Sequence, residues 1–178
     1  PQNRPNFDFF NYAGIHRPVW LCTTPADHIE DVTVVPHTDG TVHYAVQTTG
    51  GVPVSVRVLD AAGAAVASAE GAKGTLHIPD VHLWEPKPGV PYLYTLHITC
   101  GADQYDQTFG VRSIEVKGTQ VLLNGKPLYF KGFCKHEDFT AHGRGFDPVL
   151  NIKDVNLLHW TNANAVRASH YPYAEEFY

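Results

Sequence analysis

The chain has 178 residues, of which 43% are hydrophobic, 12% aromatic and 17% charged. This composition is typical of a globular protein with a core and excludes an intrinsically disordered chain. The net charge of −5 gives no basis for sequence-independent binding to nucleic acid. No apolar run approaches the roughly 20 residues that a membrane span requires. Because the chain starts with proline and contains no methionine, we expect an internal piece of a longer protein.

Residues 7–18 are rich in aromatic side chains, but no strand or helix pattern precedes them. We therefore expect this stretch to be the end of an earlier domain.

Residues 31–112 alternate short runs of β-forming residues with turn signals, at the roughly 8- to 12-residue spacing of a sandwich. Six or seven strands in this stretch predict an immunoglobulin-like antiparallel sandwich. A run of small residues at 61–69 also fits a helix, but Gly63 and the flanking turns favour an edge strand with Val66 facing inward. The other predicted strands are residues 32–35, 42–46, 52–59, 75–78, 92–99 and 104–111.

A β-hairpin is predicted next, because the Asn124-Gly125 pair is flanked by β-forming residues at 120–123 and 127–130. The apolar run at residues 128–133 predicts a further strand.

A polar loop over residues 135–145 leads to Asp147-Pro148, which is typical of a helix N-cap followed by proline in the first helical position. Apolar residues at helical spacing predict a helix that ends near Thr161. A short strand at residues 165–167 follows.

Another helix start is predicted at Pro172. The order strand, helix, strand, helix is the beginning of a parallel α/β unit. Two strands cannot close a barrel, so we expect this domain to be incomplete within the chain.

Candidate functional residues follow the two strands of this unit, where parallel α/β barrels place their working residues. The triplet His136-Glu137-Asp138 follows the first strand and His170 follows the second. The triplet also fits a helix cap or a solvated loop. His170 also fits a neutral histidine that hydrogen-bonds to the backbone.

The sequence favours no metal site, although it contains eleven histidines, because no zinc-binding spacing occurs. Cys22, Cys100 and Cys134 are too few for a disulfide framework, and we expect free, mostly buried thiols. A bridge between Cys22 and Cys100 stays open. Ser169 has no nucleophile elbow around it, so serine chemistry is not expected.

Five stretches resemble glycoside hydrolase family 2. Residues 164–172 (NAVRASHYP) resemble the first signature of the family, residues 83–86 (LWEP) the end of its immunoglobulin-like domain, and residues 131–138 (KGFCKHED) its first barrel strand and loop. Residues 8–17 and 143–147 resemble the members of the family that cleave β-glucuronides.

The resemblance implies a mainly β fold in three parts. Residues 1–18 would be the tail of a jelly-roll sugar-binding domain, residues 19–112 an immunoglobulin-like sandwich, and residues 113–178 the first strands and helices of a (β/α)8 TIM barrel.

The resemblance also implies hydrolysis with retention by two glutamates about 5 to 5.5 Å apart. The acid/base in the family is the Glu of an Asn-Glu pair, and this sequence contains no such pair. The family members that act on glucuronides bind the carboxylate through Asn-x-Lys, whereas residues 124–126 and 151–153 lie in the predicted hairpin and helix. We therefore expect no catalytic residue in this chain, which alone would be inactive.

What the resemblance assigns to the chain is part of the sugar pocket. Asp8 and His170 would bind the sugar, and a charged acceptor such as Asp8 makes hydrogen bonds about twice as strong as neutral ones. The remaining residues would support the pocket: Arg167 beneath the nucleophile, His136 and Glu137 at the floor, and Asn164 at a strand end.

The implied partners are a β-glucuronide substrate and further copies of the chain in a tetramer, with no cofactor, nucleic acid or membrane. Two alternatives stay open: a non-catalytic module for carbohydrate binding or subunit contacts, and a sister activity such as β-galactosidase or β-mannosidase. The compartment is not readable, although the lack of an Asn-x-Ser/Thr site and the odd cysteine count favour an intracellular protein.

Overall fold

The computed structural model describes residues 14–140 and 143–178, which fall into two compact units. One unit is formed by Cys22–Tyr129, and the other combines the residues up to Leu21 with Phe130–Tyr178. The predicted jelly-roll tail falls largely on residues 1–13, which lie outside the described residues together with the candidate Asp8.

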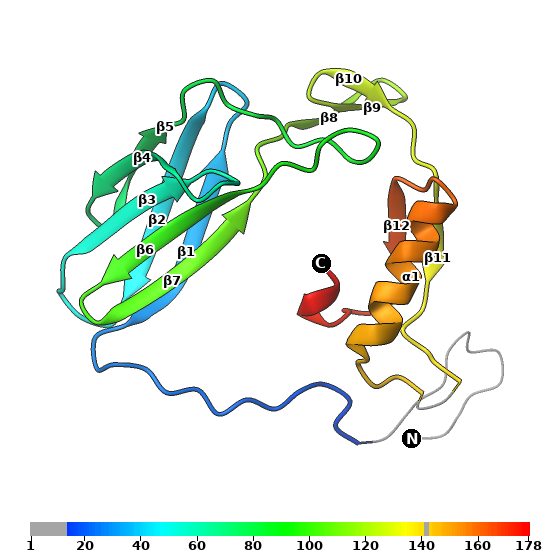
Figure 1. Cartoon of the computed structure of the whole chain (residues 1–178), viewed down its shortest axis with the longest axis horizontal. Helices are drawn as coiled ribbons and strands as arrows, with labels where there is room; N and C mark the ends of the chain where they lie inside the picture. The colour runs from blue at the N-terminus through cyan, green and yellow to red at the C-terminus, as the bar shows by residue number, and fades with distance from the viewer. Residues whose placement is uncertain (1–13, 141–142) are drawn as a thin grey trace. The chain divides into compact units, whose positions relative to one another are not determined.

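The first unit is a sandwich of two antiparallel sheets, which Figure 1 shows face to face. One sheet has the order β1-β2-β5, with strands β1 (Ile29–Pro36), β2 (Thr41–Thr48) and β5 (Lys73–His77). The other has the order β4-β3-β6-β7, with strands β4 (Ala65–Glu70), β3 (Val54–Leu59), β6 (Tyr94–Cys100) and β7 (Asp103–Phe109). These seven strands confirm the predicted sandwich.

The core of the sandwich lies between the two sheets and is built from every second residue of the central strands. Successive side chains of a strand point to opposite faces, so alternate positions meet in the core. Val66 on the edge strand β4 packs against this core, which confirms the prediction of an inward-facing edge residue. Among the most deeply buried core residues are Val42 on β2, Val56 and Val58 on β3, and Leu96, Ile98 and Cys100 on β6.

A small antiparallel sheet follows the sandwich, with strands β8 (Ile114–Lys117), β9 (Gln120–Leu123) and β10 (Lys126–Leu128). The β9–β10 turn consists of Asn124 with φ 51° and Gly125 with φ 74°. Two successive residues with positive φ are what a two-residue type I′ turn requires, and this pair confirms the predicted hairpin.

The predicted strand over residues 128–133 is wrong. Strand β10 ends at Leu128, and β11 (Gly132–Lys135) starts after a break at Tyr129, Phe130 and Lys131. The two strands pair in different sheets, β10 with β9 and β11 with β12 (Ala165–Ala168). A continuous apolar run does not reveal where a chain changes its pairing partner.

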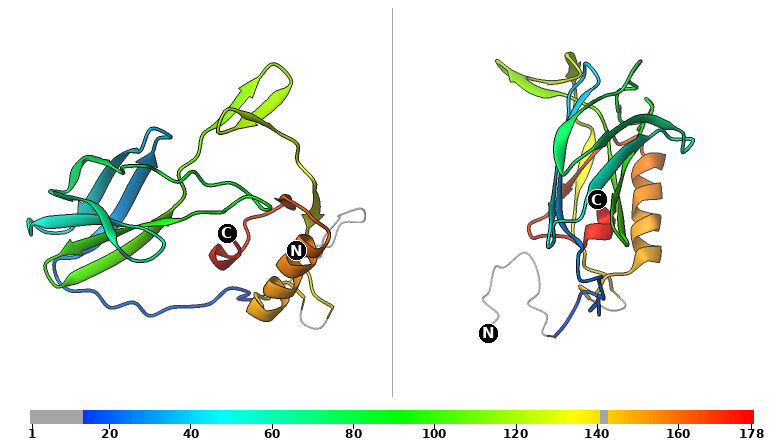
Figure 2. Two further views of the ribbon diagram at one scale, coloured as in Figure 1. Left: turned by 45° about the horizontal axis from the view of Figure 1, so that its top comes forward. Right: turned by 90° about the vertical axis from the view of Figure 1, so that its left-hand side faces the viewer.

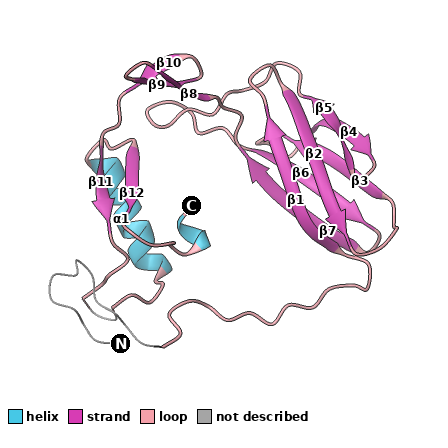
Figure 3. Ribbon diagram, turned by 180° about the vertical axis from the view of Figure 1, so that it is seen from behind, coloured by secondary structure: helices cyan, strands magenta, loops and turns pink. Residues whose placement is uncertain are grey.

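The second unit contains a strand, a helix and a strand in the predicted order. Strands β11 and β12 are parallel, and α1 (Pro148–Trp160) lies between them in sequence. Figures 2 and 3 show α1 running beside the strand pair. Asp147 caps the helix by accepting hydrogen bonds from the backbone N–H groups of Val149 and Leu150 at 2.9 and 3.0 Å. This arrangement confirms the predicted start of a parallel α/β unit.

Two further predictions need correction. The helix start at Pro172 is only a 3-10 turn, η1 (Glu175–Phe177). The three cysteines are free as predicted, but only Cys100 is buried, whereas Cys22 and Cys134 are exposed. No helix in the described part of the chain has the length and apolar character needed to cross a membrane.

Candidate functional site

The candidate residues gather at the carboxyl ends of the two parallel strands. His136 and Glu137 directly follow β11, and His170 lies two residues beyond the end of β12. Because parallel strands end at the same edge of a sheet, these loops meet there. The rings of His136 and His170 are in edge-to-face contact, with centroids 5.3 Å apart and an interplanar angle of 84°.

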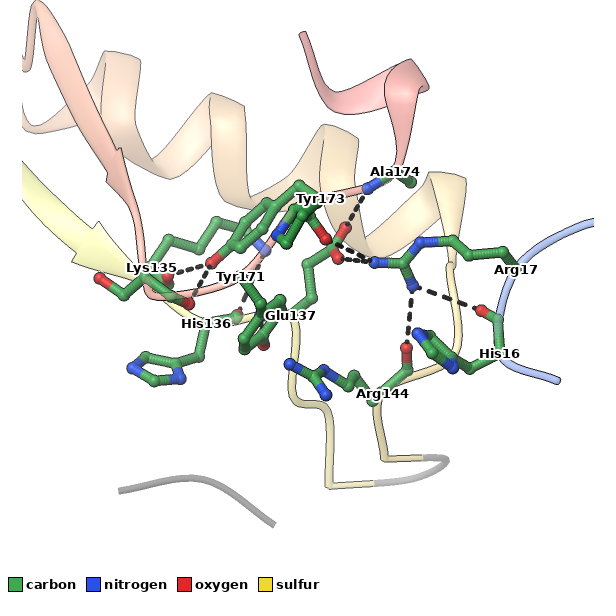
Figure 4. A network of polar contacts seen from close by, with 11 residues as sticks. His16, Arg17, Lys135, His136, Glu137, Arg144, Tyr171, Tyr173 and Ala174 are labelled. Atoms are coloured by element: carbon green, nitrogen blue, oxygen red, sulfur yellow. Dashed lines mark hydrogen bonds and ion pairs between the residues drawn. The ribbon is translucent and has the colours of Figure 1, made fainter. Parts of the chain in front are cut away.

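Glu137 is the most deeply buried charged residue at this edge, with 1% of its surface exposed. Its carboxylate accepts a hydrogen bond from the Arg17 guanidinium at 2.5 Å and another from the backbone N–H of Ala174 at 3.4 Å (Figure 4). A buried carboxylate is costly unless it is paired and hydrogen-bonded, and both conditions are met here. A solvated loop therefore does not describe this position.

Arg17 connects three separate segments of the second unit. Besides the Glu137 carboxylate, its guanidinium donates to the backbone carbonyls of Arg144 at 3.3 Å and Pro172 at 3.4 Å. The backbone of the neighbouring His16 accepts a hydrogen bond from the N–H of Phe146 at 3.4 Å. The planar guanidinium offers five donors in a fixed fork, so one side chain can bind acceptors from several segments at once.

Tyr171 is held from two sides in the loop after β12. Its hydroxyl accepts a hydrogen bond from the backbone N–H of Glu137 at 2.9 Å. The guanidinium of Arg144 lies over its ring, 3.4 Å from the centroid. A cation so close to an aromatic face is attracted by the ring quadrupole.

Tyr173 ties the same loop to the end of β11. Its hydroxyl donates to the backbone carbonyl of Lys135 and lies 3.3 Å from the carbonyl of Ser169. Burial raises the pKa of the Tyr173 hydroxyl well above its ordinary value, with a smaller contribution from Tyr171. The hydroxyl therefore stays protonated and keeps its role as a donor.

Lys135 anchors the end of β11 to the helix. Its ammonium forms an ion pair with Asp154 of α1 at 3.1 Å and lies 5.5 Å from the centroid of the Tyr173 ring. Only 9% of the Lys135 side chain is exposed. The strand end, the helix and the loop after β12 are thus joined through one side chain.

A hollow of about 560 Å³ opens beside this network, and its lining combines aromatic side chains with charged groups of both signs, including Glu175 and Glu176. A volume of this size falls within the range of small-molecule sites. Its arginine and aromatic side chains are Arg17, Trp20, Arg144, Tyr171 and Tyr173.

The two remaining candidates lie away from the network. Arg167 is on β12, where its guanidinium contacts the sulfur of Cys134 at 3.8 Å and the hydroxyl of Ser169 at 3.4 Å. The side chain of Asn164 accepts a hydrogen bond from the backbone N–H of Lys131 at 2.8 Å. It therefore holds the amino-terminal edge of the strand pair, opposite the edge that carries His170.

The site contains residues that the sequence reasoning did not select. Arg17 was not expected to pair with Glu137, and no periodicity links positions 120 residues apart. No signal in the sequence identifies Arg17 as this partner, because the need for a cation follows only from the burial of Glu137. Among the described residues, no group of three or more His, Cys, Asp or Glu side chains has an arrangement that could hold a metal ion.

The chain matches two domain models of one enzyme family. Residues 27–112 match "Glycosyl hydrolases family 2", and residues 114–178 match "Glycosyl hydrolases family 2, TIM barrel domain". With the sandwich and the parallel α/β unit described above, these matches define the class: the chain belongs to glycoside hydrolase family 2.

The relatives and structures most informative about this chain are β-glucuronidases. The enzymes of Felis catus and Paenibacillus borealis are each 46% identical, over 96% and 95% of the chain. The structure of Faecalibacterium prausnitzii β-glucuronidase superposes on 99% of the chain with a TM-score of 0.96 and 83% identity. A Ruminococcus gnavus β-glucuronidase in complex with D-glucuronic acid superposes on 96% of it with a TM-score of 0.90 and 45% identity.

The chain spans only part of these proteins. It covers 29% and 30% of the length of the Felis catus and Paenibacillus borealis enzymes. It covers 30% and 31% of the Faecalibacterium and Ruminococcus structures.

Proposed function

We propose that this chain serves in a retaining β-glucuronidase, where it supplies part of the sugar pocket while the two catalytic glutamates come from residues outside it. The observation that carries the proposal is the 83% identity, over 99% of the chain, with the Faecalibacterium prausnitzii β-glucuronidase. The substrate class follows from that enzyme and from the D-glucuronic acid complex of the Ruminococcus gnavus relative.

The edge formed by the carboxyl ends of β11 and β12 supports the placement of the pocket. His170 and His136 meet there, and the buried Glu137 follows His136 in the chain. In α/β barrels this edge carries the chemistry, whereas the opposite edge serves stability. We assign sugar contacts to His170 and to Asp8, whose carboxylate would accept hydrogen bonds from sugar hydroxyls.

Arg167 has a different role in the proposal. Its guanidinium extends from β12 beside Cys134 and Ser169, within the strand pair rather than in the loops. A fixed positive charge at that position lowers the pKa of a nearby carboxyl, which suits a glutamate that must be ionised to act as a nucleophile. Asn164 holds the far edge of the strand pair in register.

The proposed domain limits are residues 1–18, 19–112 and 113–178, and the two family matches at 27–112 and 114–178 support the second boundary. We also propose assembly as a homo-oligomer, with a tetramer as the expected state. Light scattering after size-exclusion chromatography tests this part independently of activity.

The experiment for the activity uses a hybrid enzyme, in which the 178 residues replace the matching segment of the Faecalibacterium prausnitzii β-glucuronidase. The fit between the two structures makes a folded hybrid the expected result. We expect it to cleave p-nitrophenyl β-D-glucuronide with kcat/KM within about tenfold of the parent and to prefer it over the β-galactoside. A folded hybrid that lacks this activity, or that prefers the galactoside, would contradict the proposal.

A further inference from the structure

The loop from Ser169 to Ala174 has little hydrogen bonding of its own and is held mainly by contacts with other segments. Its regular structure is limited to the 3-10 turn that follows it. The backbone N–H of Ser169 donates to the carbonyl of Lys135 at 2.9 Å, which fixes the start of the loop. Its remaining contacts therefore decide the direction in which His170 points.

Besides the contact of the Tyr173 hydroxyl with the Lys135 carbonyl and that of the His170 ring with His136, several of those contacts involve one ion pair, Arg17–Glu137. Glu137 accepts from the N–H of Ala174 at 3.4 Å, and its own N–H donates to the Tyr171 hydroxyl at 2.9 Å. Arg17 donates to the carbonyl of Pro172 at 3.4 Å. The two side chains thus hold the loop at Pro172 and Ala174, and the backbone of Glu137 holds it at Tyr171, all within four residues of His170.

The pair also joins this loop to the other two segments. The Arg17 guanidinium donates to the carbonyl of Arg144, and Arg144 in turn lies on the Tyr171 ring. Figure 4 shows Arg17 reaching in from the segment that carries His16 toward Glu137, with Tyr171 and Tyr173 beside the carboxylate. Moving any of the three segments would stretch a contact of this pair.

The geometry points to Glu137 and Arg17 as positioning residues that set the orientation of His170 toward the sugar. This inference rests on the proposed function, because it gives the ion pair a role in the pocket assigned there. Neither side chain needs to touch the substrate. A misplacement of about 1 Å in a positioned group can cost about 100-fold in rate, so the effect is expected in kinetics as well as in stability.

The test is a double-mutant cycle in the hybrid enzyme between Glu137→Gln and His170→Ala, with Glu115→Gln on the exposed strand β8 as the matched control. Glu137→Gln alone is expected to lower kcat/KM for the aryl glucuronide by about 10- to 100-fold. In the His170→Ala background it is expected to lower it by less than about threefold, because coupled residues are not additive. The control Glu115→Gln is expected to leave kcat/KM unchanged in both the unsubstituted and the His170→Ala backgrounds.

Fully additive losses, or a Glu137→Gln enzyme as active as the unsubstituted hybrid, would overturn the positioning role. If Glu137→Gln does not fold, the same cycle is run with Arg17→Lys, which keeps the charge but not the fork of donors. Arg17→Lys is expected to retain more activity than Arg17→Ala, and equal losses would count against the inference.

A second readout does not depend on activity. In the hybrid enzyme, NMR of the histidine rings is expected to show a shifted His170 signal in the Glu137→Gln variant and an unchanged His97 signal. An unshifted His170 would overturn the inference. An inactive unsubstituted hybrid together with a shifted His170 would contradict the proposed function and leave the positioning role standing.

Discussion

Arg17 and Glu137 are 120 residues apart in the sequence and form an ion pair of 2.5 Å, with 26% and 2% of their side chains exposed. Removing one partner of a buried pair leaves an uncompensated charge, which costs more than the pair itself contributes. We therefore expect the loss of one partner to destabilise the surrounding loops by more than the intact pair stabilises them.

Arg17→Ala is expected to loosen the loop after β12 without affecting the sandwich. The Ala174 amide, which donates to the Glu137 carboxylate, and the Glu137 amide, which donates to Tyr171, should exchange with solvent deuterium about 10- to 100-fold faster. Hydrogen-exchange mass spectrometry of the chain measures this directly. Arg57→Ala on the exposed face of β3 serves as the control, and equal exchange in both variants would show that the pair does not hold the loop.

The sandwich should lose stability in alkaline solution. Burial raises the pKa of the Tyr44 and Tyr94 hydroxyls above their ordinary value of 10.0. The folded chain therefore keeps protons that the unfolded chain releases near pH 10, so the free energy of unfolding is at its full value below that pH and falls as the pH rises further. The expected slope is at most about 1.4 kcal/mol per pH unit for each group.

Tyr44→Phe separates this effect from general alkaline damage. The variant loses the hydrogen bond from Tyr44 to the Gly71 carbonyl at 3.1 Å and with it about 1 kcal/mol at neutral pH. Its stability should nevertheless fall less steeply above pH 10 than that of the unsubstituted chain in urea unfolding. Tyr105→Phe, at a half-exposed position on β7, should keep the original slope. Identical slopes in all three proteins would refute the assignment.

Cys134 should react with alkylating agents at lower pH than an ordinary thiol. The pKa of its exposed thiol is lowered by hydrogen bonding from Arg167 and, to a smaller extent, from Ser169. The thiolate is the reactive form, so Arg167→Gln should shift the pH dependence of alkylation by iodoacetamide to higher pH. Cys22 in the same molecule is the internal reference, and an unchanged profile at Cys134 would show that Arg167 does not act on the thiol.

Much of the fold was predictable because its signals are local. The alternation of buried and exposed residues marks β2 and β3, the Asn124-Gly125 pair marks the hairpin, and the capping residue Asp147 marks the start of α1. Each of these signals depends on neighbours within a few residues. The break between β10 and β11 was missed because it depends on which distant strand each one pairs with.

The site was predictable only in part for the same reason. The position of His136 and His170 after parallel strands follows from strand order, and their proximity could be expected. The partner of Glu137 could not be expected, because Arg17 comes from a segment that precedes the whole sandwich in sequence. The exposed thiol of Cys134 was also missed, since cysteine is among the residue types most often buried.

The most direct measurement of the central claim is the activity of His170→Ala in the hybrid enzyme, with His77→Ala on the exposed face of β5 as the control. A hydrogen bond from His170 to the sugar predicts a loss of about 1.5 to 3 kcal/mol of transition-state stabilisation, which is roughly a 10- to 150-fold fall in kcat/KM for the aryl β-glucuronide. The His77→Ala enzyme should remain within about twofold of the unsubstituted hybrid. If His170→Ala does so as well, this chain does not form the sugar pocket in the way we propose.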